Sequence, residues 1–313
     1  GEMMKILLGN KGDVEVLLAF KGQEGLEKHN ELYTYLKKKE IFKGDLCEIY
    51  SLISPNENVI FLGLGDREKL NLQSLRKAFY KVGKELMRLK VESAKVSIPK
   101  FENLCYKNTC MAIAEGLLQS EYSFDKYLSE KKNKHAVKEF YLDVLEDKKE
   151  RAQEAIDEIY NVIDGIFLTR DLVNEPAIVL TPKELAKRAK EELEPLGVEV
   201  EVLGKEKIEG LGMKAFLAVS KGSANEPQFI IMKWNGDKNS SKKVALVGKG
   251  ITYDSGGYSI KTHEGMATMF NDMAGAASVI GTMKAIAKSK IEKNVVALVA
   301  ACENLISGEY YPR

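Results

Sequence analysis

Residues 244–287 read VALVGKGITYDSGGYSIKTHEGMATMFNDMAGAASVIGTMKAIA. The opening VALV is a short apolar run, which is typical of a buried strand, and we expect that strand to cover residues 243–247. A glycine-rich connection follows, and apolar residues at helical spacing predict a helix from Met273 to Ser289. A strand that leads through a glycine-rich connection into a helix indicates an α/β domain.

Four charged residues lie in this connection: Lys249, Asp254, Lys261 and Asp272. Open α/β sheets place their ligands at the carboxyl edge, where we expect Lys249 and its two flanking glycines. Carboxylates are ligands for divalent cations, and two such ions can activate a water for hydrolysis. A lysine amine binds a metal only when it is neutral, whereas a charged lysine stabilises an oxyanion. The small residues of MAGAA (273–277) are expected to let another backbone approach closely.

Other interpretations of these residues stay open. Glycines around Lys249 are also compatible with a plain turn or a phosphate loop, although the GxxxxGK[ST] pattern is absent from the segment. Asp272 is also an acid of the kind that a helix N-terminus favours. Met266 and Met269 are compatible with ordinary packing, and His263 with a solvent-facing loop position.

Strand and helix signals alternate along the rest of the chain. Further strands are expected at residues 15–20, 48–54, 59–65, 95–99, 139–145, 198–204, 228–234 and 294–301. Further helices are expected at residues 72–89, 108–118 and 182–196, the last with Thr181 as its N-cap. The sequence contains no internal repeat and no low-complexity tract.

A long amphipathic helix is predicted to separate two α/β regions. Isoleucines recur at three- and four-residue intervals over residues 148–169, which indicates one apolar helix face, and DLVNEP after it is expected to form a turn. We assign residues 1–147 to an N-terminal α/β domain and residues 148–169 to a connecting helix. Residues 170–313 are assigned to a second α/β domain with a mostly parallel central sheet.

Composition argues against several classes of protein. The 47 Lys+Arg and 46 Asp+Glu residues give a net charge of +1, which does not favour nucleic acid or an anionic membrane as a partner. No apolar run reaches the roughly 20 residues that span a bilayer, and no secretory signal is evident, so a cytoplasmic protein is expected. The four cysteines are expected to be free thiols. The three histidines (His29, His135 and His263) lack metal-binding spacing.

Several motifs, in order along the chain, resemble the leucyl aminopeptidase family of cytosolic dinuclear metallo-aminopeptidases. They are RDLVNEP (170–176), LTPKELA (180–186), VGKGITYDSGG (247–257), SIK (259–261), MATMFNDMAGAA (266–277) and CENLISG (302–308). The likeness covers roughly residues 170–313, whereas the first 150 residues agree only in length and α/β pattern. The resemblance implies that residues 170–313 are the N-terminal part of an α/β metallopeptidase catalytic domain, of which the C-terminal part is missing. The sequence departs from the family pattern at Ile178, Thr262, His263 and Ala274, none of which is an expected metal ligand.

The resemblance implies a role for each of five residues. Lys249, Asp254 and Asp272 would be metal ligands, with Asp254 shared between two divalent ions, zinc or manganese. Lys261 would be the charged catalytic lysine. Met269 would line the pocket for the first side chain of the substrate. The family also implies a homo-hexamer that acts on peptides in the cytoplasm.

One family motif is absent from this sequence. NTDAEGRL carries the remaining acidic ligands and a catalytic arginine in the family, and no such run occurs here. Three protein ligands are too few for two closely spaced ions. We therefore expect that the natural protein continues beyond Arg313, and that the chain as printed is inactive.

The resemblance thus implies a hydrolase, a metal-dependent aminopeptidase that removes leucine-like N-terminal residues from peptides with a water activated by two metals. The alternative is a non-catalytic scaffold or DNA-binding protein that retains the aminopeptidase fold, since some relatives bind DNA. An intact distal acid pair and arginine in the complete gene would favour the enzyme.

Overall fold

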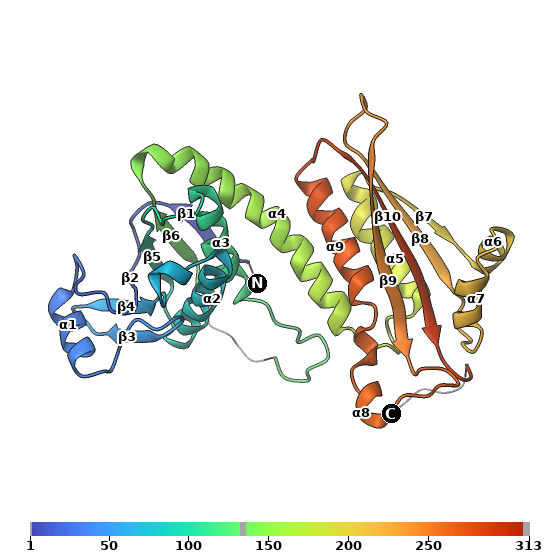
Figure 1. The fold of residues 1–313 in the computed structure, drawn as a ribbon, viewed down its shortest axis with the longest axis horizontal. Helices are drawn as coiled ribbons and strands as arrows, with labels where there is room; N and C mark the ends of the chain where they lie inside the picture. The colour runs from blue at the N-terminus through green and yellow to red at the C-terminus, as the bar shows by residue number, and fades with distance from the viewer. Residues whose placement is uncertain (1, 132–135, 309–313) are drawn as a thin grey trace. The chain divides into compact units, whose positions relative to one another are not determined.

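The structure is a computed structural model, and it describes residues 2–131 and 136–308. The chain divides into two compact units, Gly1–Tyr160 and Asn161–Arg313 (Figure 1). Each unit combines a sheet with helices, which confirms the predicted α/β class. The assignment of domains to residues 1–147, 148–169 and 170–313 stays a prediction. His135 and Arg313 lie outside the described residues.

A six-stranded sheet forms the centre of the first unit, in the order β1-β6-β5-β2-β4-β3. Its strands are β1 (Lys5–Leu8), β2 (Val14–Ala19), β3 (Ile49–Ile53), β4 (Asn58–Gly63), β5 (Ser93–Ser97) and β6 (Glu139–Asp143). Neighbouring strands are parallel except β3 and β4, which are antiparallel. The edge strand β1 is not among the predicted strands.

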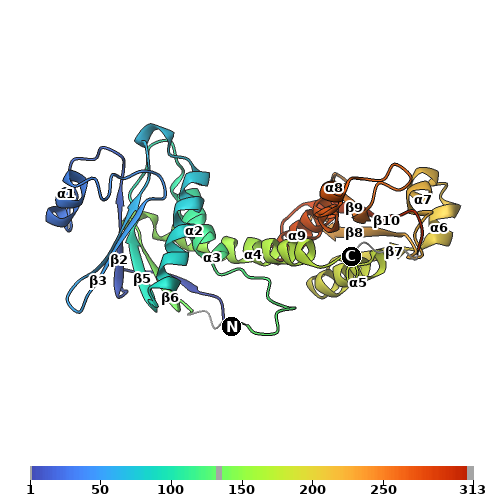
Figure 2. The ribbon, with the colours of Figure 1, turned by 90° about the horizontal axis from the view of Figure 1, so that it is seen from below.

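Three helices pack with this sheet, and short 3-10 turns precede two longer helices. They are α1 (Asn30–Lys38), α2 (Leu72–Arg88) and α3 (Tyr106–Gln119), with η1 (Arg67–Lys69) and η2 (Glu146–Lys148). Helix α2 begins at Asn71, whose side chain accepts a hydrogen bond from the Ser74 N–H. Helices α2 and α3 lie side by side in both views (Figures 1 and 2). Tyr33, Phe42 and Phe61 are fully buried and form part of a core between α1 and the sheet.

The sheet of the second unit is mixed, in the order β7-β8-β10-β9. Its strands are β7 (Glu199–Leu203), β8 (Gln228–Asn235), β9 (Lys243–Asp254) and β10 (Asn294–Asn304). Only β10 and β9 are parallel, so the prediction of a mostly parallel sheet is wrong for the described strands. The short loop after β8 reverses the chain into β9. The connection from β9 to β10 contains α9 (Ala274–Lys288) and is long enough to make these two neighbouring strands parallel.

Helices α5 (Pro182–Leu193) and α9 cover one face of this sheet and share a buried core with β8 and β10 (Figures 1 and 2). Helix α5 begins where the sequence predicts, because Thr181 accepts a hydrogen bond from the Glu184 N–H and proline follows it. The predicted extension of this helix to Leu196 is the 3-10 turn η3 (Glu194–Leu196). Two short helices that the sequence pattern did not predict, α6 (Lys205–Gly210) and α7 (Lys214–Ser220), join β7 to β8.

Helix α4 (Lys149–Asn174) crosses the division between the two units. It continues past residue 169, so the prediction of a turn at DLVNEP is wrong for its first four residues. Leu168 and Leu172 are both buried in the core of the second unit and extend the apolar face by one more turn.

No helix within residues 2–131 and 136–308 is long and apolar enough to cross a membrane. All four cysteines are free thiols, as predicted.

Candidate metal centre

Strand β9 carries Lys249 in its middle and Asp254 as its last residue. The prediction that this strand ends at residue 247 is wrong, because β9 stays paired with β10 as far as the Asn304↔Asp254 pair. Lys249 therefore projects from regular strand, opposite Ala300, and not from a loop at the sheet edge.

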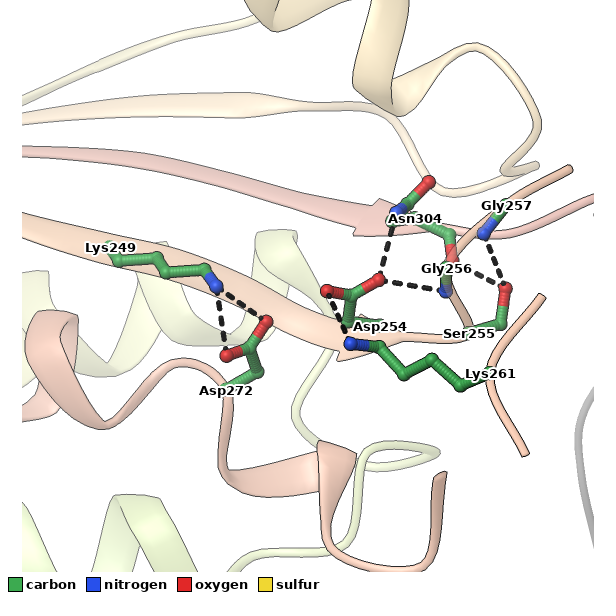
Figure 3. Close-up of polar contacts among 8 residues, drawn as sticks. All are labelled: Lys249, Asp254, Ser255, Gly256, Gly257, Lys261, Asp272 and Asn304. Atoms are coloured by element: carbon green, nitrogen blue, oxygen red, sulfur yellow. Dashed lines mark hydrogen bonds and ion pairs between the residues drawn. The ribbon is translucent and has the colours of Figure 1, made fainter. Parts of the chain in front are cut away.

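Asp272 lies beside β9 because α9 approaches the strand closely. The 3-10 turn η4 (Met269–Asn271) ends at Asp272, just before α9. A Cβ at Gly248 would lie 2.7 Å from the Gly275 carbonyl oxygen, so glycine is required in the strand at this crossing. The expected close backbone approach at MAGAA is thereby confirmed. As a result, Lys249 Nζ lies 2.9 Å from both carboxylate oxygens of Asp272 (Figure 3).

A tight turn after β9 orients Asp254. Its Oδ1 accepts hydrogen bonds from the Gly256 N–H at 2.9 Å and from Asn304 Nδ2 at 2.8 Å. Gly256 and Gly257 have φ angles of 87° and 61°, in the left-handed region that favours glycine. The turn returns the chain towards the site, so that Lys261 Nζ lies 3.7 Å from Asp254 Oδ2 (Figure 3).

The electrostatics of the turn keep Asp254 ionised. Burial raises the pKa of its carboxyl, but this effect is outweighed by hydrogen bonds from the Gly256 N–H and the Asn304 amide. A hydrogen bond with the Asp272 carboxyl and the charge of Lys261 act in the same direction, and the net pKa of Asp254 is below its usual value. The carboxylate is therefore charged at neutral pH, as a metal ligand has to be.

The four charged residues that the sequence predicts for a site thus meet in two ion pairs, Lys249–Asp272 and Lys261–Asp254. In the described ranges, no three His, Cys, Asp or Glu side chains cluster in a way that could hold a metal. Asp272 Oδ2 is buried and accepts no well-aligned hydrogen bond from a described residue, although Lys249 Nζ is 2.9 Å away. Two carboxylates and an amine fit a divalent cation, with its other positions left to water, substrate or further ligands.

Met269 and His263 lie on the chain segment between Lys261 and Asp272. Met269 is half-buried in η4, and its predicted place in a substrate pocket stays a prediction. His263 is exposed in the four-residue helix α8 (His263–Met266), in agreement with its expected solvent-facing position.

Strand pairing brings one residue to the site that the sequence analysis missed. Asn304 donates to Asp254, yet it lies at the end of β10, where we expected no strand. The sequence did carry a signal for Asn304, because Glu303 and Asn304 in CENLISG are two polar residues just after an apolar strand. A β-bulge sets its register, because Cys302 pairs with Ile251 whereas Glu303 pairs with Tyr253.

The bulge leaves Thr252 without a partner residue on β10. The hydroxyl of Thr252 is buried and also lacks a partner: Thr252 is 1% exposed, and its Oγ1 has no hydrogen-bond partner among the described residues. We expect Thr252→Val to raise the free energy of unfolding of the chain by about 1 kcal/mol, because valine keeps the shape and removes a buried polar group. Urea denaturation would measure the change.

The control is Thr169→Val, the same chemical change at a hydroxyl that does have partners. Thr169 Oγ1 lies 3.0 Å from the Gly165 carbonyl oxygen and 3.1 Å from that of Ala277. The free energy of unfolding of the Thr169→Val variant is expected to be about 1 kcal/mol lower than that of the unmodified chain. Equal loss in both variants would show that the Thr252 hydroxyl is satisfied in solution.

Models of two domains of one family together match most of the chain. The model described as the N-terminal domain of the cytosol aminopeptidase family matches residues 14–131, and the model of its catalytic domain matches residues 167–312. The chain belongs to the cytosol aminopeptidase family. This confirms the resemblance found in the sequence, and residues 14–131, which carried no motif, are part of the match.

Family members of known sequence are longer than this chain. A probable cytosol aminopeptidase of Clostridium tetani is 60% identical over 309 residues, which are 98% of this chain and 64% of that protein. A probable cytosol aminopeptidase of Treponema denticola is 45% identical over 309 residues, which again are 98% of this chain and 64% of that protein. The chain thus spans less than two thirds of the length of these two probable cytosol aminopeptidases.

Two solved structures share the fold of this chain. A mutant of tomato leucine aminopeptidase superposes with a TM-score of 0.78 at 26% identity, covering 100% of this chain and 65% of that chain. The bottromycin maturation enzyme BotP superposes with a TM-score of 0.77 at 24% identity, covering 95% of this chain and 61% of the BotP chain.

Proposed function

We propose that the complete protein is a metal-dependent aminopeptidase that removes leucine-like residues from the N-terminus of peptides. Membership of the cytosol aminopeptidase family supports the reaction class. The observation that carries the proposal for this chain is the pair of ion pairs along the second half of β9, Lys249 with Asp272 and Lys261 with Asp254. These are the residues to which the family resemblance assigns the chemistry.

Lys249, Asp254 and Asp272 would hold the metal in this proposal. Their oxygen and nitrogen atoms suit zinc or manganese, and two ions would supply an activated water and an electrophilic contact for the scissile carbonyl. Asp254 is held ionised by its hydrogen bonds, and Asp272 has a buried oxygen that accepts no well-aligned hydrogen bond from a described residue. Lys249 would have to lose a proton and leave its ion pair with Asp272 before its amine coordinates.

Lys261 would remain charged and act on the substrate. Its ammonium is held near the site by the glycine turn, 3.7 Å from Asp254, and its side chain is 34% exposed. An ammonium at this position is able to donate a hydrogen bond to the carbonyl oxygen and to stabilise the negative charge that develops on it. Met269, in the turn before Asp272, would contact the first side chain of the substrate.

We also propose that the complete protein acts in the cytoplasm on free peptides and assembles as a homo-hexamer. Both statements rest on the family alone. The balanced charge of the chain agrees with peptides as partners more than with nucleic acid.

Removal of divalent ions is the test of this function. We expect a chelator to abolish hydrolysis of leucine p-nitroanilide by the complete protein, and added Mn²⁺ or Zn²⁺ to restore it, because the water is activated only by the metal. An N-acetylated leucine anilide serves as the control substrate and should resist hydrolysis in all samples. Undiminished hydrolysis in the chelator would refute a metal mechanism, and hydrolysis of the blocked substrate would refute aminopeptidase specificity.

A further inference from the structure

Asn304 occupies a position that only the β-bulge makes possible. Unbroken pairing onwards from Cys302 and Ile251 would place Glu303 opposite Thr252 and Asn304 opposite Tyr253. With the bulge, Asn304 pairs with Asp254 at the ends of the two strands. Bulges next to functional sites commonly re-aim one side chain in this way.

The side-chain amide of Asn304 is fixed in one orientation. Its Nδ2 donates to Asp254 Oδ1 at 2.8 Å, and an ionised carboxylate accepts only from the NH₂ end of an amide. The opposite end packs on the turn, since a Cβ at Gly257 would lie 2.9 Å from Asn304 Oδ1 (Figure 3). Glycine at residue 257 therefore leaves room for the amide.

The backbone of Asn304 holds the same turn from the other side. Its carbonyl oxygen accepts hydrogen bonds from the Ser255 N–H at 3.0 Å and from Ser255 Oγ at 2.8 Å. One residue thus binds both the side chain of Asp254 and the backbone that follows it. Strand β10 is anchored just before this point, because Glu303 is fully buried and accepts a hydrogen bond from Ser223 Oγ at 3.2 Å.

The two carboxylate oxygens of Asp254 have different partners. Oδ1 accepts from Gly256 and Asn304, so the plane of the carboxylate is set by two donors. Oδ2 faces Lys261 and accepts no hydrogen bond from Asn304. Removing the amide would leave the Gly256 N–H as the remaining donor to Oδ1 among these groups, and the carboxylate would then rotate more freely.

We propose that Asn304 is a positioning residue, which holds the Asp254 carboxylate in the orientation that binds the divalent cation. The inference rests on the proposed function, because it takes Asp254 to be a metal ligand. Partners that orient a ligand in this manner typically change metal affinity by about 10- to 100-fold when they are replaced.

The experiment measures the dissociation constant of Mn²⁺ for the complete protein by calorimetric titration. The variants are Asn304→Leu, which keeps the volume without a donor, and Asn304→Ala. Ser255→Ala is the matched control, since it removes the hydroxyl that donates to the Asn304 carbonyl and accepts from the Gly257 N–H, and it leaves the contact between the Asn304 amide and Asp254 in place. Unfolding in chelator, followed by circular dichroism, shows that each variant is folded.

We expect Mn²⁺ to bind Asn304→Leu about 10- to 100-fold more weakly than wild type, and Ser255→Ala within about threefold of it. Equal affinity of Asn304→Leu and wild type would overturn the inference while leaving the proposed function intact. Equal weakening in Asn304→Leu and Ser255→Ala would overturn it in favour of general packing at the strand end. Wild-type protein that fails to bind Mn²⁺ would overturn the proposed function, and this inference with it.

Discussion

Lys261→Ala is expected to lower kcat of the complete protein about 100- to 1,000-fold, the usual effect of removing one donor that stabilises an oxyanion. The ammonium is the group near Asp254 that stays charged in the proposed mechanism, and alanine leaves nothing in its place. The metal content of the Lys261→Ala variant should equal that of wild type, because the carboxylates of Asp254 and Asp272 are untouched. Steady-state hydrolysis of leucine p-nitroanilide and elemental analysis of the same samples measure the two quantities.

The pattern of the kinetic constants decides how Lys261 acts. A contact made only in the transition state lowers kcat and kcat/KM equally, whereas a contact that only binds substrate raises KM. Lys261→Arg keeps the charge but not the geometry and is expected to restore activity only in part. The control is Lys242→Ala, an exposed lysine in the loop before β9, which should be as active as wild type. Full activity of Lys261→Ala would remove the lysine from the mechanism, and a loss of metal would make its role structural.

Gly281→Ala is expected to destabilise the second unit by about 2–3 kcal/mol, as overpacking of a tight contact does. Helices α4 and α9 touch at this residue: a Cβ there would lie 2.0 Å from Thr169 Oγ1 and 2.4 Å from the Gly165 carbonyl oxygen. The threonine is able to turn away, but the carbonyl belongs to the backbone of α4 and moves only with the helix. The gain of up to about 1 kcal/mol in helix propensity offsets part of the loss.

A second helical glycine provides the matched control for Gly281. Gly210, the last residue of α6, has open space where a Cβ would be added, so Gly210→Ala is expected to be neutral or slightly stabilising. Trp234 is the single tryptophan and packs against the core of the second unit, so its fluorescence in urea reports on this unit. If Gly281→Ala and Gly210→Ala were equally stable, α4 and α9 would move apart to accept the added Cβ without a loss of free energy of unfolding.

The strand–turn–helix segment explains why so much of the candidate site was predictable. Lys249, Asp254, Lys261 and Asp272 lie within one continuous stretch, so the local course of the chain is enough to bring them together. Asn304 was missed because it reaches the site through the pairing of β10 with β9, and its register depends on the bulge at Thr252. No periodicity in the sequence marks a bulge, since it is a property of two paired strands.

Local signals were sufficient for the α/β class, for the start of α5 at Thr181 and for the close approach at MAGAA, because capping, apolar periodicity and side-chain size act over a few residues. The direction of neighbouring strands, the length of β9 and the position of Asn304 were decided only by the tertiary structure. These features arise from backbone hydrogen bonds between segments far apart in the chain. Such bonds use the N–H and C=O groups that nearly every residue carries, and the residue types therefore leave them unspecified.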